Sequence, residues 1–234
     1  MINVRIINAS ILSIGLALSG YFIANGLKES RKHDRSVEVK GLAEHTMKSD
    51  EAIWTINIKL VNGELPALYQ SIDDAQKKMK QFLEKQGFVA EEIITNPVSV
   101  TDNQSIGYNQ SLNIPRYSAD TGLTISTKRI DPVAAAIQKT GELIEQGVVV
   151  TTSSAIYRFN GLNQIKPQML TEATQSAHAA AQSFANNAKA TLGSIRRATQ
   201  GLFTITDANS TYDSGTSIMK KIRVVTSIDY ELEE

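Results

Sequence analysis

The 234-residue chain carries 24 Lys plus Arg and 24 Asp plus Glu, so its formal net charge is zero. This balance disfavours a nucleic-acid-binding protein, whose affinity depends on an excess of basic residues. The absence of cysteine excludes disulfides, thiolate nucleophiles and Cys-ligated zinc, and also the acylated cysteine of bacterial lipoproteins.

An uncharged apolar run, Ile6–Leu27, stands near the N-terminus. Its length of about 22 residues is enough to cross a hydrocarbon core as a helix. Two interpretations compete. As an uncleaved anchor the whole run stays in the membrane, and its length favours this interpretation. As a signal peptide, with Arg5 as its positive start, it is removed by cleavage near Ser19.

The anchor interpretation defines residues 1–35 as membrane segment and linker and residues 36–234 as the domain. Small residues within the run permit close approach of another helix, although such residues are common in membrane helices in general. They are Gly15, Ser19, Gly20 and Ala24. Lys and Arg are more frequent after the run than before it, which by the positive-inside rule places the domain in the cytoplasm.

Beyond Ser36 the hydrophobic pattern alternates between strand and helix periods. Strands are predicted over residues 36–40, 54–60, 93–100, 116–128, 148–159, 195–206 and 217–232. Helices are predicted over residues 66–87, 131–146 and 167–193. Strand–helix–strand–strand therefore occurs twice, bridged by the helix of residues 131–146. This order predicts an α+β fold of two halves with long β-hairpins, preceded by one transmembrane helix.

Each predicted helix has a stripe of apolar residues that are expected to face the core. In the first they are Leu68, Ile72, Ala75, Met79, Phe82 and Leu83, and in the bridging helix Ala135, Ile137, Leu143 and Ile144. In the third they are Leu170, Ala173, Ala177, Ala180, Ala181, Phe184, Ala188 and Leu192. The many alanines of the third helix predict unusually close packing against a neighbour.

Several short motifs resemble the SIMPL-domain family. They are the opening of residues 37–44 followed by Asp50 and the strand through Trp54, then Tyr117-Ser118-Ala119, and the alanine-repeating helix ending at Leu192-Gly193. The resemblance covers roughly Ser36 to Leu232. It implies an exported α+β domain that self-associates, because bacterial members are mostly periplasmic or outer-membrane immunogenic proteins. Some are linked to oxidative-stress tolerance, and at least one forms a ring-like oligomer. The family has no agreed enzymatic activity, so the resemblance implies no catalytic residue.

The resemblance also bears on topology. Whole domains are translocated despite flanking charge, so it favours a single-pass protein of the bacterial inner membrane with its domain in the periplasm. Release into the periplasm after cleavage near Ser19 is the alternative.

No chemical motif stands out. The histidines, His33, His45 and His178, lack the spacing of metal ligands. The segment Asp207–Asp213 begins like a calcium loop, but Tyr212 and Ile218 occupy the positions of its glycine and its last glutamate, so a hairpin turn is the better interpretation.

The adjacent carboxylates Asp73 and Asp74 point about 100° apart on a helix and are expected to be solvated. There is no nucleophile elbow and no phosphate-binding glycine loop. We therefore assign no catalytic, cofactor-binding or metal-binding residue, expect no cofactor and do not expect an enzyme.

Two functional hypotheses follow. The first is an envelope-facing structural protein that assembles with copies of itself through the edges of the hairpins over residues 93–128 and 195–232. Apolar contacts would come from Leu123, Ile125, Val224 and Ile228. The partners would be other copies and the inner membrane, through residues 6–27, but no nucleic acid. The alternative is a periplasmic binding module for an envelope partner or a small ligand.

Overall fold

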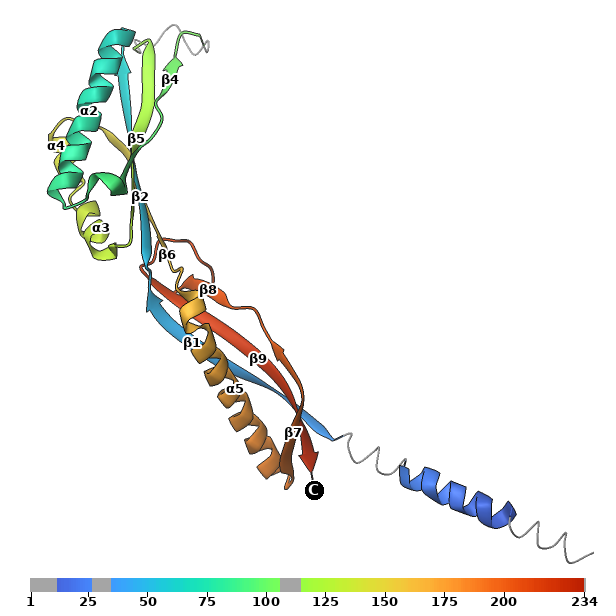
Figure 1. The fold of residues 1–234 in the computed structure, drawn as a ribbon. Helices are drawn as coiled ribbons and strands as arrows, with labels where there is room; N and C mark the ends of the chain where they lie inside the picture. The colour runs from blue at the N-terminus through green and yellow to red at the C-terminus, as the bar shows by residue number, and fades with distance from the viewer. Residues whose placement is uncertain (1–11, 27–34, 106–114, 234) are drawn as a thin grey trace, which may run out of the picture. The chain divides into compact units, whose positions relative to one another are not determined.

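The computed structural model describes residues 12–26, 35–105 and 115–233 (Figure 1). The chain is α+β, with two antiparallel sheets, as the sequence predicts. Its contacts divide it into two compact units. Unit 1 consists of Met1–Glu44, Lys166–Phe203 and Arg223–Glu234, and unit 2 of His45–Ile165 and Thr204–Ile222. The predicted domain of residues 36–234 therefore contains two units, neither of which is continuous in sequence.

The described part of the apolar run is a helix over residues 12–26, which contains the four small residues noted above. Residues 6–11 and Leu27, the ends of the predicted membrane span, lie outside the described residues, as does His33. No helix in the described ranges combines the length and the apolar character needed to cross a membrane.

The sheet of unit 2 is built around β2 (Glu51–Asn62). On one side β2 pairs with β5 (Tyr117–Thr127), and on the other with β6 (Val150–Arg158). Two short strands, β3 (Ile93–Thr95) and β4 (Ser99–Asp102), both pair with β5. The order places β6 at one edge of this sheet.

Two predicted elements are interrupted. The strand of residues 93–100 breaks between β3 and β4, where Pro97 has no N–H to donate to a ladder. The bridging helix is two helices, α3 (Ile130–Ile137) and α4 (Gly141–Glu145), separated by a turn closed by i to i−3 hydrogen bonds.

Two of the predicted inward residues of the bridging segment are exposed. Val133 and Ala136 are buried, whereas Ala135 is exposed. Leu143 is buried as predicted, but Ile144 is 63% exposed. The prediction of a single continuous helix was wrong, because a turn separates α3 from α4.

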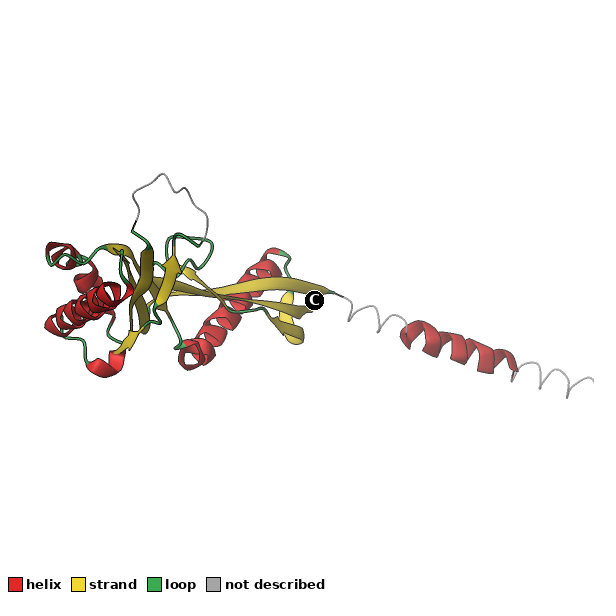
Figure 2. Cartoon of the chain, turned by 90° about the horizontal axis from the view of Figure 1, so that it is seen from above, coloured by secondary structure: helices red, strands yellow, loops and turns green. Residues whose placement is uncertain are grey.

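The core of unit 2 lies between this sheet and its helices. Figure 2 shows α2 (Leu65–Lys85), α3 and α4 on one face of the sheet. All six predicted inward residues of α2 are buried. Four of them share a core cluster with Trp54, Ile56 and Ile58 of β2, which have no exposed surface, and the other two, Leu68 and Ile72, cluster with Ala119 of β5.

The sheet of unit 1 has the order β1-β9-β7, with β1 (Ser36–Lys48), β9 (Met219–Glu233) and β7 (Thr191–Gln200). The short strand β8 (Thr204–Asp207), which belongs to unit 2, also pairs with β9. As β3 and β4 share β5, so β7 and β8 share β9. The parallel is partial, because β2 pairs with β5 whereas β6 pairs with β2 and lies in the other sheet from β9.

Helix α5 (Leu162–Asn187) packs its small residues against unit 1. Its buried residues are spaced by four: Met169, Ala173, Ala177, Ala181 and Ala185. A Cβ on Gly41 of β1 would lie 1.9 Å from the carbonyl oxygen of Ala173, so strand and helix approach closely, as the alanines predict. Phe184, by contrast, is 59% exposed rather than inward.

The four proposed oligomer contacts need correction. Leu123 and Ile125 are fully buried in the core of unit 2, and Val224 and Ile228 are 1% exposed. The strands that carry them, β5 and β9, are central in their sheets rather than edges. Alternation in the sequence identifies the apolar face of a strand, but it does not distinguish the chain's own core from a contact with a second copy.

Candidate functional site

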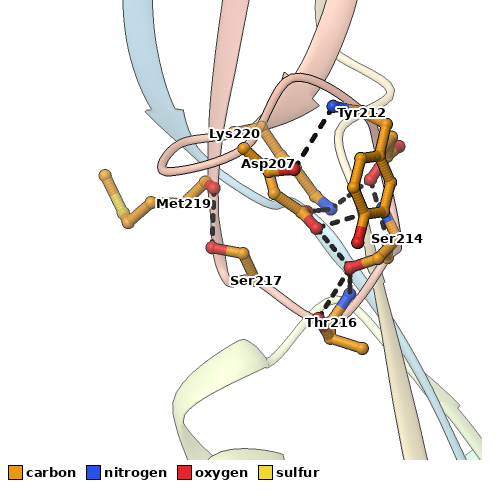
Figure 3. Close-up of polar contacts among 10 residues, drawn as sticks. Asp207, Tyr212, Ser214, Thr216, Ser217, Met219 and Lys220 are labelled. Carbon is orange, nitrogen blue, oxygen red and sulfur yellow. Dashed lines mark hydrogen bonds and ion pairs between the residues drawn. The ribbon is translucent and has the colours of Figure 1, made fainter.

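A cluster of charged and hydroxyl groups surrounds Lys220 in unit 2 (Figure 3). Lys220 stands near the start of β9, in phase with the buried residues of that strand, and its side chain has no exposed surface. Its Nζ lies 2.5 Å from Oδ1 of Asp207 and 2.6 Å from Oδ1 of Asp213. A fully buried lysine is rare in proteins unless it is paired, and here it is paired twice.

The two carboxylates are also bound by the connection between β8 and β9. The N–H of Ser214 donates to Oδ2 of Asp207 at 3.0 Å, and the Ser214 hydroxyl donates to the same oxygen. The N–H of Gly215 donates to Asp213 at 3.0 Å. Gly215 has a φ of +77°, which glycine adopts at no steric cost. The cluster therefore fixes the conformation of this connection.

Protonation is determined by the pairing. Burial by itself raises the pKa of Asp207, but the hydrogen bonds from Lys220 and Ser214 outweigh it and hold the pKa far below its usual value. Burial lowers the pKa of Lys220, and the two carboxylates outweigh that effect and raise it. Lys220 thus stays protonated at neutral pH, without the lone pair that a nucleophile or a general base requires.

The segment that begins like a calcium loop does surround a cation, namely the ammonium of Lys220. Asp207 and Asp213 both converge on it, and the segment is the predicted turn between strands. No group of three or more potential metal ligands occurs among the described residues. Sequence reasoning missed Lys220. The available signal was its position, because it alternates with the apolar residues Ile222 and Val224 and follows two nearby aspartates.

A polar cleft of about 330 Å³ is a second candidate site, also within unit 2. Strands β2, β5 and β6 and the connection between β3 and β4 form it. Its lining residues are Asn57, Asn96, Pro97, Asp120, Thr121, Thr151 and Thr152. Its charged member, Asp120, lies 3.5 Å from Nζ of Lys59.

The other residues considered from sequence are not brought together. His45 is on β1 and His178 on α5, where its ring meets the edge of Tyr230 at 5.9 Å between centroids. Asp73 and Asp74 form separate ion pairs, each with the lysine four residues later, on the exposed side of α2.

Comparison with known proteins gives one family. A sequence model of the SIMPL family, described as "Protein of unknown function (DUF541)", matches residues 37–225. No curated protein matches the chain. Among solved structures, the regulatory subunit of aspartate kinase from Thermus flavus is similar at 13% identity and a TM-score of 0.19, over 82% of this chain and 89% of that one. So low a score supports no argument about this protein. The family match covers most of the sequence, and the chain belongs to the SIMPL family.

Proposed function

We propose that this protein is a non-catalytic structural protein that assembles with copies of itself, and that strand β6 forms the contact. The observation that supports the proposal is the edge of the five-stranded sheet. β6 stands at the end of that sheet's strand order, so one side of its backbone faces away from β2. Such edges pair with another strand unless the protein blocks them.

Apart from Arg158 at its end, β6 lacks the charges that usually block an edge. From Val148 to Tyr157 there is no charged residue and no proline. The side chains from Thr151 to Ser154 are exposed, and Ile156 is 41% exposed. By contrast β7, an edge of the other sheet, carries Arg196 and Arg197 and two register shifts, all devices that discourage pairing.

One end of the β6 edge is already covered. The N–H of Tyr157 donates to the carbonyl of Gly215 at 2.6 Å, so the connection fixed by Lys220 closes the edge there. Because N–H direction alternates along a strand, the N–H groups of Ser153 and Ala155 face the same side as that of Tyr157. The open stretch is short and polar, which suits a defined pairing of two chains better than open-ended aggregation.

The proposal includes the location. The apolar run Ile6–Leu27 would anchor the protein in the bacterial inner membrane and leave both units in the periplasm, as an envelope-facing component. The length of the run and the exported character of the family support this placement. A cleaved signal, with a mature chain starting near Ser19, is the alternative.

The test is the same substitution on two exposed edge serines, Ser154→Lys on β6 and Ser194→Lys on β7. The mass of the full-length protein in mild detergent is measured by light scattering. We expect an oligomer that Ser154→Lys dissociates and Ser194→Lys does not, with both variants melting cooperatively. A parent protein with the mass of one chain contradicts the assembly. Dissociation by both variants, or by Ser194→Lys alone, contradicts the role of β6.

A chain beginning at Ser36 separates the domain from the anchor. If β6 forms the contact, this shorter chain should form an oligomer with the same number of copies in the absence of detergent. A single-chain mass for it, together with an oligomeric full-length protein, would assign assembly to the N-terminal run and contradict our proposal.

A further inference from the structure

The polar cleft lies on a face of the unit 2 sheet that differs from the core face. On β2, the inward residues Ile56 and Ile58 are fully buried, and Asn57 between them points to the opposite side. The helices α2, α3 and α4 lie on the core side (Figure 2). The cleft is thus open for a ligand, and through Thr151 and Thr152 it shares strand β6 with the edge proposed for assembly.

Two irregularities of the sheet shape the cleft. The register of β6 against β2 shifts after Asn57, which pairs with Thr152, whereas Ile58 pairs with Val150. The unpaired Thr151 and its neighbour Thr152 both line the cleft. Opposite Asn57 on β5 stands Gly122, where a Cβ would lie 2.1 Å from the carbonyl oxygen of Ile56. Bulges and strand glycines often mark places where a ligand approaches.

Asn96 is held rigidly at the rim. Its N–H donates to the carbonyl of Gly122 at 3.0 Å, and its own carbonyl accepts from the Thr121 hydroxyl at 3.2 Å. Its side-chain Oδ1 accepts from the Thr124 hydroxyl at 2.9 Å. These bonds fix the amide and leave its Nδ2 as a donor without a partner among the described residues.

Two further polar side chains of the cleft have no hydrogen-bond partner among the described residues. The side-chain amide of Asn57 and the hydroxyl of Thr152 have no hydrogen bond to another residue in the described ranges. Together with Nδ2 of Asn96 they offer donors and acceptors on rigid strands, where their positions are set before a ligand arrives. Pro97 adds an apolar surface beside them.

We propose that this cleft binds one ring of a neutral sugar. Sugar hydroxyls both donate and accept, as do the amides and hydroxyls of the lining, and the CH face of a ring can lie on Pro97. The volume is at the small end of the range for ligand sites, which fits a single ring. A negatively charged sugar would meet the carboxylate of Asp120, and the cation beside it, Lys59, is already paired with that carboxylate at 3.5 Å, so such a sugar is disfavoured.

The test uses the full-length protein in lauryldimethylamine oxide, because detergents with sugar headgroups would compete. Saturation-transfer NMR is recorded with glucose, galactose, N-acetylglucosamine and glucuronate. The variants are Thr152→Val, which removes one hydroxyl while keeping shape and strand preference, and Asn57→Ala. Ser154→Ala on the same exposed side of β6 is the matched control.

We expect saturable binding of at least one neutral sugar, weakened about tenfold in Thr152→Val and in Asn57→Ala and unchanged in Ser154→Ala. Glucuronate should bind at least tenfold more weakly than its neutral counterpart. Three results would each overturn the proposal: no saturable binding of any neutral sugar, equal binding of glucuronate, or equal weakening in Ser154→Ala. If Asn57→Ala fails to fold, Thr152→Val alone decides.

Discussion

The ammonium of Lys220 lies 2.5 Å from Oδ1 of Asp207, and the two side chains are 0% and 7% exposed. A buried pair of this kind contributes little net stability compared with an apolar pair, but removing one partner leaves the other charge buried and unpaired. The cost of a single substitution is therefore large.

We predict that Lys220→Met lowers the free energy of unfolding by about 3–5 kcal/mol, measured by urea denaturation. The exposed Lys128→Met is the control and should change it by no more than about 0.5 kcal/mol. Adding Asp207→Asn to Lys220→Met should recover part of the loss, because the buried carboxylate is then neutral. A Lys220→Met protein as stable as the parent would show that the carboxylates reach water without the lysine.

A second ion pair predicts pH dependence. Nε of Arg129 donates to Glu92 at 3.1 Å, and the N–H of Val89 donates to its other oxygen at 3.1 Å. The hydrogen bonds from Arg129, chiefly, lower the pKa of Glu92 from 4.5 to about 2. A lowered folded pKa means that this contribution is complete above pH 4.5 and is lost as the pH falls toward 2.

Glu92→Gln should therefore destabilise the protein at neutral pH and flatten the fall in stability between these two pH values. We expect about 1–2 kcal/mol at pH 7, because Arg129 is half exposed and its charge is screened. Urea titrations across the acid range measure the difference. Glu91→Gln, on the exposed neighbour, is the control. An unchanged slope in Glu92→Gln would contradict the assignment.

The close contact of β1 with α5 predicts that alanine is costly at Gly41, and Gly63, which has open space around it, serves as the comparison. Gly41→Ala places a Cβ 1.9 Å from Ala173 O, so strand and helix must separate, at a cost of about 2–3 kcal/mol or more. Gly63→Ala meets nothing within 4 Å and should be neutral or stabilise by up to about 1 kcal/mol. Thermal melts followed by circular dichroism measure both. Equal melting temperatures for the two variants would contradict the close packing.

The proposed location can be tested with a single cysteine, because the natural chain has none. Leu202 is 88% exposed, so Leu202→Cys should leave the fold intact. If the units lie in the periplasm, a maleimide that cannot cross the inner membrane labels this cysteine in cells whose outer membrane is permeabilised. Labelling that requires rupture of the inner membrane would place the units in the cytoplasm.

The sequence predicts well where a period is long and unbroken. The 3.6-residue period of α2 gives all six buried residues, because 21 residues of one helix leave little ambiguity of phase. The prediction for the bridging segment is wrong at Ile144, because local hydrogen bonds after Ile137 end the first helix, and Gly141 was the available signal of that interruption.

Pairing between strands was harder to predict than the strands themselves. Alternation marks β5 and β9 as strands with one apolar face, but their central positions depend on partners distant in sequence. The cleft at Asn57 has the same property, because it joins residues from separate strands that only the register of the sheet brings together. The cluster at Lys220 is local by contrast, since Asp207 and Asp213 lie 13 and 7 residues before the lysine.

The pairing of β1 with β9 has a consequence for biogenesis. The first strand of unit 1 begins at Ser36, and its neighbour in the sheet is the last strand of the chain, which ends at Glu233. β1 therefore gains its neighbour only after the elements between them, including all of unit 2, have been synthesised, so the sheet of unit 1 is completed later than that of unit 2.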